Sequence, residues 1–213
     1  MAAVWSIVSD EREHKNMTAK KKPKKNIYQL KVTLRDSKPP IWRRLFVSDR
    51  TTLLDLHKII QISMGWTNSH LHQFIIDGGY YSIPSDEDWE PVIDEREYQI
   101  AKIAPKEQRK FIYAYDFGDS WEHEILVEKI LPIDPDTAYP KCIKGKRACP
   151  PEDVGGVWGF EEFLEAMKDP NHEEHESYIT WWGGQYDPEA FDLEKINQGL
   201  QKIDDIEWWW DDL

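Results

Sequence analysis

The sequence has few of the residues that disulfide-linked and membrane-spanning proteins require. It contains two cysteines, Cys142 and Cys149, and no apolar run of the ~18 residues that a transmembrane helix needs. Two thiols cannot by themselves complete a four-thiolate zinc site, so we expect them to pack or to hold a loop, with a redox pair as the alternative. These absences predict a soluble, cytoplasmic protein with reduced thiols.

Several sequence signatures of catalysis are also missing. There is no G-x-S-x-G nucleophile elbow, no G-x-x-x-x-G-K phosphate loop and no dinucleotide-binding glycine fingerprint. The histidines of "HEEHE" at 172–176 are three residues apart rather than four, which favours a solvated helix start over a zinc-protease helix. The glycines of 155–159 have a spacing typical of a turn that enters a helix, with an anion site as the alternative.

Positive charge is scarce after the first 26 residues. Those residues hold seven of the 27 Lys/Arg and three of the 40 Asp/Glu, so they carry about +4 and the rest of the chain about −17. Such an acidic body disfavours broad contact with nucleic-acid phosphates. We expect residues 1–26 to be a disordered tail that only solubilises the protein or that contacts nucleic acid weakly. The lysines available for this contact are Lys20, Lys21, Lys22, Lys24 and Lys25.

Hydrophobic patterns with a regular period begin after this tail. Residues 27–34 alternate between apolar and polar, which predicts a strand with one buried face. After a proline-containing turn, residues 41–47 predict a second strand, in which Arg43 and Arg44 point to opposite faces.

The next segment changes to a helical period. Thr52 and Asp55 have the spacing of a capping box, and Gly65 is placed to end the helix. Residues 70–83 then predict a hairpin that turns at 78–79.

The middle of the sequence alternates between irregular and regular segments. Residues 84–108 are acidic and poorly periodic, and we expect a surface excursion there. Residues 110–130 predict a second hairpin, with Gly118 at its turn available for a positive φ. Residues 131–159 are rich in proline and glycine, which predicts an ordered but irregular loop.

The last third of the sequence is predicted to be helical. One helix is expected over 160–168, and a second is expected to begin with Asn171 as its cap and to end at Gly183. A third helix is expected to be capped at Asp187 or to restart at Asp192.

These elements predict an α+β fold. We expect a ββαβ start, a mixed or largely antiparallel sheet of about five or six strands with helices packed on it, and a helical C-terminal third. Residues 27–203 are expected to form a single domain, followed by an acidic, tryptophan-rich tail over 204–213.

The segment "FGDSWEHEI" at 117–125 raises the main chemical question. His123 shares a strand face with Trp121 and Ile125, so we expect it at the rim of the buried face. A structural hydrogen bond is the favoured role, because buried polar groups are nearly always paired.

A metal site is the alternative role for this histidine. It would join side chains from neighbouring strands, and its candidate ligands are His70, His72, Asp116 and His123. A metal-dependent hydrolase built around it would need candidate catalytic residues to converge, namely Asp119 and His123 with Glu152 or Asp153.

Five segments together resemble a known family. They are "IWRRL" at 41–45, "LHQFII" at 71–76, "YDFGDSWEHEI" at 115–125, "CPPEDVGG" at 149–156 and "YDPEAFD" at 186–192. From about Ile27 to about Ile203 the sequence resembles the plasmid pRiA4b ORF-3-like family. This resemblance implies a compact α+β domain and an occurrence on plasmids and near mobile elements, and it carries no established catalytic residue.

Some members of that family are labelled transposon resolvases, an activity that this sequence disfavours. A serine resolvase needs an activated serine among arginines that hold the scissile phosphate. The motif segments here carry carboxylates instead, and arginines such as Arg43, Arg44, Arg96, Arg109 and Arg147 are scattered along the chain.

We therefore expect a non-enzymatic binding or adaptor domain, associated with a plasmid or mobile-element system. It is expected to need no cofactor unless the histidine cluster holds a divalent metal, and to contact protein rather than membrane. The candidate partner-binding residues are Trp208, Trp209 and Trp210, unless these tryptophans pack back on the domain.

Overall fold

The computed structural model describes residues 25–86 and 90–205. Residues 206–213, which hold the three tryptophans of the tail, and all but Lys25 of the candidate nucleic-acid lysines lie outside these ranges. The roles expected for both groups therefore stay predictions.

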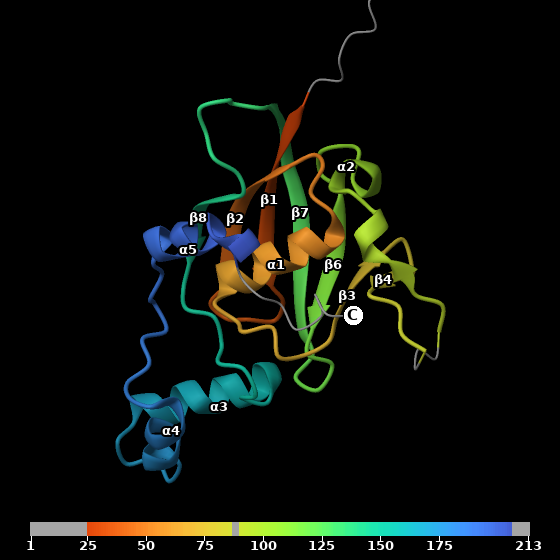
Figure 1. The fold of residues 1–213 in the computed structure, drawn as a ribbon. Coiled ribbons are helices and arrows are strands. Elements are labelled where there is room, and N and C mark those ends of the chain that lie inside the picture. The colour runs from red at the N-terminus through yellow and green to blue at the C-terminus, as the bar shows by residue number, and fades with distance from the viewer. Residues whose placement is uncertain (1–24, 87–89, 206–213) are drawn as a thin grey trace, which may run out of the picture.

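A single mixed sheet forms the centre of the fold (Figure 1). In the described part of the chain it has eight strands in the order β5-β4-β3-β6-β7-β1-β2-β8, and all neighbours are antiparallel except β4 and β5. The strands are β1 (Asn26–Leu34), β2 (Trp42–Ser48), β3 (His72–Ile76), β4 (Gly79–Ser82), β5 (Ile93–Asp94), β6 (Lys110–Tyr115), β7 (Trp121–Pro132) and β8 (Lys141–Lys146). The α+β class is confirmed, but the expected number of five or six strands is too low.

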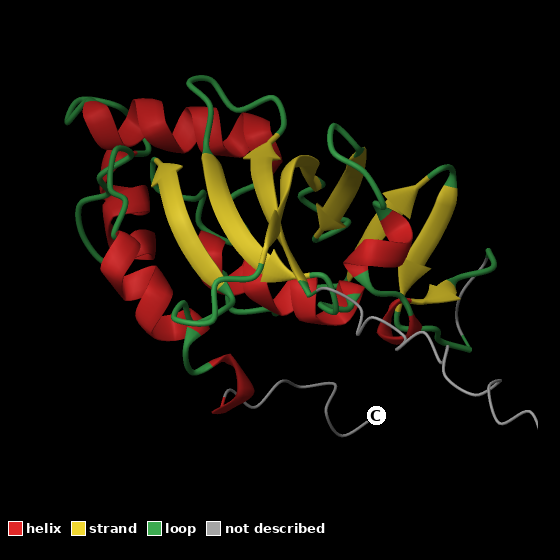
Figure 2. Ribbon diagram, turned by 90° about the horizontal axis from the view of Figure 1, so that it is seen from above, coloured by secondary structure: helices red, strands yellow, loops and turns green. Residues whose placement is uncertain are grey.

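Helices accompany this sheet at one face and at its lower end in Figure 1. They are α1 (Leu53–Met64), α2 (Ile100–Ile103), α3 (Gly156–Lys168), α4 (His175–Trp182) and α5 (Leu193–Leu200), with 3-10 turns η1 (Glu95–Glu97) and η2 (Ile203–Asp205). Helix α1 crosses the face of the sheet, and α5 packs beside α1 and β8. Figure 2 shows the twist of the strands from above. No helix in the described ranges is long and apolar enough to cross a membrane.

The first hairpin and α1 follow the sequence pattern closely. The alternating residues Leu30 and Val32 of β1 are fully buried, as expected for a strand with one apolar face. Helix α1 begins with the predicted capping box of Thr52 and Asp55 and ends at Gly65, whose φ is 92°. These local signals are strong enough to fix both elements.

The two arginines of β2 confirm the predicted alternation. Arg43 is buried, and its Nε donates a hydrogen bond to the carbonyl oxygen of Ser63 at 2.7 Å. Arg44, on the other face, forms a two-pronged ion pair with Glu128 at 2.6 and 2.8 Å.

Two segments predicted as irregular contain regular structure. The surface excursion expected over 84–108 includes β5, η1 and α2, and Glu95 and Ile100 within it are fully buried. The loop expected over 131–159 contains β8, which pairs with β2. Both strands lie at an edge of the sheet, where pairing on one side only leaves little hydrophobic alternation to recognise.

Some of the predicted details of turns and helix ends are wrong, and others are confirmed. The β6–β7 turn takes its positive φ values at Asp116 (55°) and Ser120 (56°) and not at Gly118. Helix α4 begins at His175 without a side-chain cap, so the predicted cap at Asn171 is wrong, whereas the end at Gly183 is confirmed. Helix α5 restarts after Asp192, whose side chain accepts a hydrogen bond from the backbone N–H of Lys195 at 2.9 Å.

Candidate functional site

Three loops meet where the β6–β7 turn approaches the start of α3, at the lower end of the sheet in Figure 1. They are the segment 66–70 after α1, the turn 116–120, and the segment 149–155 before α3. The Trp66 indole N–H donates a hydrogen bond to the carbonyl oxygen of Pro150 at 3.0 Å. The backbone N–H of Gly155 donates to the Asp119 carboxylate at 3.1 Å. The motif segments are therefore joined in space.

A histidine and two carboxylates converge at this junction. His70 Nε2 lies 3.2 Å from Asp153 Oδ1 and 3.7 Å from Asp116 Oδ2. The three donor atoms, one per residue, all lie within 4.8 Å of one another, a separation that a single metal ion could bridge. His70 Nε2 is itself buried and makes no hydrogen bond of ordinary geometry within residues 25–86 and 90–205.

The turn orients the Asp116 carboxylate. Asp116 has a positive φ and is 7% exposed, and its Oδ1 accepts hydrogen bonds from the backbone N–H groups of Gly118 and Asp119 at 3.0 and 3.2 Å. Aspartate tolerates the left-handed region and readily forms such turns with its own backbone. Its other oxygen, Oδ2, is thereby left facing His70.

Glu152 ties the third loop to the other two. Its carboxylate accepts hydrogen bonds from the Thr67 backbone N–H at 3.1 Å, from the Thr67 hydroxyl at 2.5 Å and from the Tyr115 hydroxyl. Burial, followed by the Glu152 carboxylate, raises the pKa of Tyr115, so this hydroxyl stays protonated as a donor. Glu152 is thus occupied by loop contacts, and the neighbouring Asp153 is the acid that reaches His70.

His72 belongs to a separate, buried group. Its Nε2 lies 2.9 and 3.1 Å from the two carboxylate oxygens of Glu95, and its ring stacks on His57 at 3.4 Å between centroids. His57 in turn contacts the Tyr113 hydroxyl and the Asn68 side-chain oxygen, each at 2.7 Å. Burial and the neighbouring His72 hold the pKa of His57 well below its usual range.

His123 is buried completely instead of lying at the rim of the core. Neither of its ring nitrogens makes a hydrogen bond of ordinary geometry to a residue that the structure describes, so the expected structural hydrogen bond is not found there. Trp66 meets the ring edge-on at 5.3 Å, and Tyr113 lies 5.5 Å away. Burial lowers the pKa of His123 to about 3, an effect that backbone groups of Tyr113 and Trp121 offset only in part.

The structure thus divides the candidate residues among three places. His70, Asp116 and Asp153 come together, Asp119 and Glu152 hold the loops, and His72 and His123 lie in the core. Sequence reasoning missed Glu95, because an acidic residue in a segment without periodicity carries no sign of burial.

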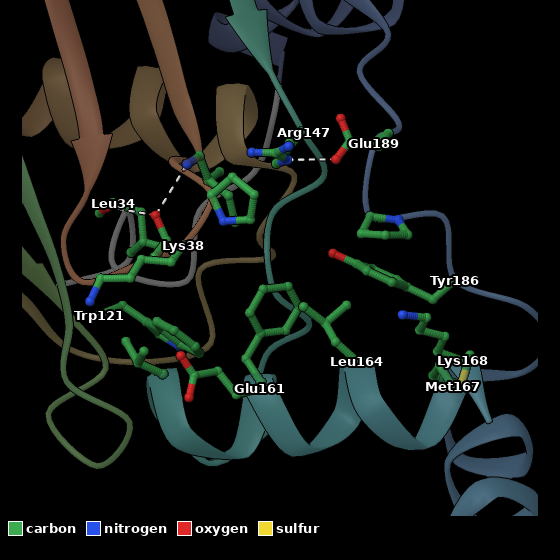
Figure 3. Close-up of a pocket in the computed structure, with 16 residues that line it drawn as sticks. Leu34, Lys38, Trp121, Arg147, Glu161, Leu164, Met167, Lys168, Tyr186 and Glu189 are labelled. Carbon is green, nitrogen blue, oxygen red and sulfur yellow. Dashed lines mark hydrogen bonds and ion pairs between the residues drawn. The ribbon is translucent and has the colours of Figure 1, made fainter. Parts of the chain in front are cut away.

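An apolar pocket opens between α3 and the end of the β1–β2 hairpin (Figure 3). Its volume is about 400 Å³, and the apolar side chains of its wall include Leu34, Ile41, Trp121, Phe160, Leu164 and Tyr186. Charged side chains lie around it: Lys38, Arg147, Glu161, Lys168 and Glu189.

Two features of this pocket concern polar groups. Trp121 is fully buried, and its indole N–H has no hydrogen-bond partner among the described residues. Arg147 and Glu189 form an ion pair at 2.6 Å on the side opposite α3, while Lys168 extends from α3 toward Tyr186 (Figure 3). The sequence signal that could indicate this pocket is the apolar side of α3, which brings Phe160 and Leu164 to its wall.

The two cysteines are free thiols. Cys142 is buried within β8, and burial raises the pKa of Cys149 to about 12. Both therefore favour the protonated thiol at neutral pH, which suits a packing role.

Comparison with known proteins gives relatives over most of the chain. The family described as plasmid pRiA4b ORF-3-like protein matches residues 26–195. "Uncharacterized protein y4hQ" of Sinorhizobium fredii is 38% identical over 181 residues, covering 84% of this chain and 92% of that protein. The crystal structure of the protein of unknown function MM3350 from Methanosarcina mazei Go1 is similar with a TM-score of 0.73 and 40% identity, covering 80% of this chain and 97% of that one.

Proposed function

Because this chain belongs to the plasmid pRiA4b ORF-3-like family, whose relatives above are described without an activity, we propose a function from the geometry alone: it binds a small apolar molecule that carries an anionic group. The observation that carries this proposal is the pocket beside α3, in which a buried indole N–H lacks a partner.

The size and lining of the pocket support a small-molecule ligand. Ligand pockets generally measure about 300–1,000 Å³ and combine mostly apolar walls with a few polar groups. The pocket of about 400 Å³ falls in this range, with Phe160 and Leu164 among its apolar walls. An apolar ligand would remove these side chains from water, worth about 25 cal/mol for each Å² buried.

The polar groups indicate where an anionic group would bind. A buried N–H without an acceptor costs roughly 1–3 kcal/mol, and a ligand oxygen near Trp121 would recover part of that cost. Lys168 forms no ion pair in the described part of the chain, whereas Arg147 is already paired with Glu189. The lysine at the edge of the pocket is therefore available to an anion.

Binding fits the structure better than the hydrolase that the sequence left open. That hydrolase required His123 to converge with Asp119 and an acid of the 149–156 segment, but His123 lies in the core. Binding of a small molecule also agrees with the non-enzymatic binding or adaptor role that the sequence predicts. Its association with a protein partner, with nucleic acid through the tail, or with a plasmid system stays a prediction.

The proposal can be tested with anilinonaphthalene sulfonate, which combines apolar rings with an anionic sulfonate. We expect saturable, one-to-one fluorescence enhancement with the folded protein, displaced by medium-chain fatty acids. Leu164→Trp should fill the pocket and weaken dye binding at least tenfold. The matched control is Glu165→Trp, which places the same side chain on the exposed face of the same helix.

Thermal unfolding of both variants would establish that they are folded before the titrations are compared. Equal dye affinity of Leu164→Trp and Glu165→Trp would refute the pocket as the binding site. Dye binding that never saturates would count equally against it.

A further inference from the structure

We propose that His70, Asp116 and Asp153 bind a divalent first-row transition-metal cation, which joins the loops at the end of the sheet. The three side chains come from three different loops, and one imidazole nitrogen and two carboxylate oxygens lie within 4.8 Å of one another. This site is separate from the apolar pocket and does not depend on the function proposed for it.

The donor spacing is close to what a bound cation imposes. Bonds of about 2.1 Å from a metal to nitrogen or oxygen place neighbouring ligands about 3.0 Å apart in an octahedron and about 3.4 Å apart in a tetrahedron. His70 Nε2 is 3.2 Å from Asp153 Oδ1 and 3.7 Å from Asp116 Oδ2. Small side-chain rotations would therefore complete a three-ligand site.

The histidine nitrogen points to a ligand independently of the carboxylates. Nearly all buried polar atoms have a hydrogen-bond partner, but His70 Nε2 is buried and has none, although two carboxylate oxygens are near. A nitrogen this close to two carboxylate oxygens, without a hydrogen bond of ordinary geometry to either, is placed to share a cation with them.

The charge around the site also favours a cation. Four carboxylates, Asp116, Asp119, Glu152 and Asp153, lie in two loops that contact one another. In residues 25–86 and 90–205 no lysine or arginine forms an ion pair with any of them. A divalent cation would offset this repulsion, and Asp153, whose side chain is 70% exposed, leaves it a route from solvent.

Neighbouring hydrogen bonds hold the ligands in place. Asp116 Oδ1 accepts hydrogen bonds from two backbone N–H groups. Glu152, the residue before Asp153, is held by hydrogen bonds from Thr67 and Tyr115. Such supporting contacts orient metal ligands and strengthen binding. The site would therefore be largely formed before the cation arrives.

The ligand set narrows the choice of metal. One imidazole and two carboxylates without a thiolate suit Zn²⁺ or Mn²⁺ better than Cu⁺, which prefers sulfur, or Ca²⁺, which takes six to eight oxygens. Water would fill the remaining coordination positions.

The test uses the full-length protein, freed of metal by a chelator and titrated with ZnCl₂ and with MnCl₂ in separate calorimetric experiments. We expect one equivalent bound at this site, with Asp153→Asn and Asp116→Asn each weakening it at least tenfold. Asparagine keeps the side-chain oxygen that the turn at Asp116 needs. Asp136→Asn, an exposed aspartate in another loop, is the matched control and should bind as the wild type does.

Broadening of the His70 ring signals by Mn²⁺ in NMR spectra would locate the ion. Melting temperatures in chelator would show that the variants are folded. The proposal is overturned if wild-type protein binds neither ion in a saturable way, or if Asp153→Asn and Asp116→Asn bind as tightly as Asp136→Asn. Dye binding in the pocket should be unchanged in Asp153→Asn, so the two proposals can fail separately.

Discussion

A fully buried histidine such as His123, which makes no hydrogen bond of ordinary geometry to the described residues, costs stability rather than adding to it. An unsatisfied polar group in the core costs roughly 1–3 kcal/mol, and charging the ring would cost more. The pKa of about 3 expresses this second cost, because the folded protein accepts the proton far less readily than the unfolded chain does.

The first prediction concerns acid stability. The unfolded chain protonates its histidines near pH 6.5 and the folded protein protonates His123 only near pH 3, so the unfolded state binds more protons between these values. The free energy of unfolding should therefore fall as pH decreases through this window, by about 1.4 kcal/mol per pH unit for this histidine. Urea unfolding at several pH values measures the slope.

His123→Met isolates the contribution of this ring. The variant removes the titrating ring and its two nitrogens and puts an apolar side chain in their place. Its free energy of unfolding should therefore fall less steeply with decreasing pH, by about 1.4 kcal/mol less per pH unit than that of the wild type. Equal slopes for His123→Met and wild type would contradict the cause assigned here.

At the scale of elements, α3 is docked on the β6–β7 turn through a contact that only glycine permits. Gly156 has a φ of 69°, and a Cβ atom there would lie 2.5 Å from the carbonyl oxygen of Asp119. The adjacent Gly155 N–H binds the Asp119 carboxylate. Gly156 therefore combines a positive φ with a close approach to the Asp119 backbone, at the point where α3 meets the β6–β7 turn.

The second prediction separates the effect of the positive φ on stability from the effect of the close contact with Asp119. Gly183→Ala changes a glycine of φ 85° with open space around it, so it should cost only about 1–2 kcal/mol for the left-handed backbone. Gly156→Ala adds overpacking against Asp119, and the total should reach about 2–4 kcal/mol. Chemical denaturation of both variants gives the difference, and equal losses would mean that the close contact is relieved without cost.

Elements with a local signal were predictable from the sequence, and elements defined by distant partners were not. The alternation of 27–34 and the Thr52–Asp55 capping box are local, and both were confirmed. Strand β8 contains Gly145 and three lysines, and it exists because β2 pairs with it and the Asn197 side chain bonds both backbone groups of Cys142 at 2.9 Å. None of those partners is near it in the sequence.

The candidate site shows the same division. Strand alternation grouped His70 with His72, but β3 begins only at His72, so His70 is free to turn toward Asp116. Asp153 was a candidate for catalysis, and its proximity to His70 depends on how the 149–155 segment crosses the hairpin turn. Residue types predicted which side chains could ligate a metal, whereas which of them lie close together depends on how the three loops are placed in space.

For the whole molecule, the strand order determines which strands resist local unfolding best. β1 and β7 are adjacent in the middle of the sheet and pair over almost the full length of β1. β4 and β5, at one edge, pair through only two residues of each strand. The opposite edge, β8, is covered by α5 through the Asn197 contacts.

The last prediction follows from this order and concerns native-state hydrogen exchange. Amides of β1 and β7 should exchange only through global unfolding, since opening them breaks the sheet in the middle, whereas β4 amides should exchange through local opening that depends little on denaturant. Strand β8 should be intermediate, and Asn197→Ala should speed exchange there while leaving β1 unchanged. Exchange measured by NMR or mass spectrometry over a series of low denaturant concentrations tests this, and β4 amides as slow as those of β1 would show that the sheet opens as one cooperative unit despite its short edge pairing.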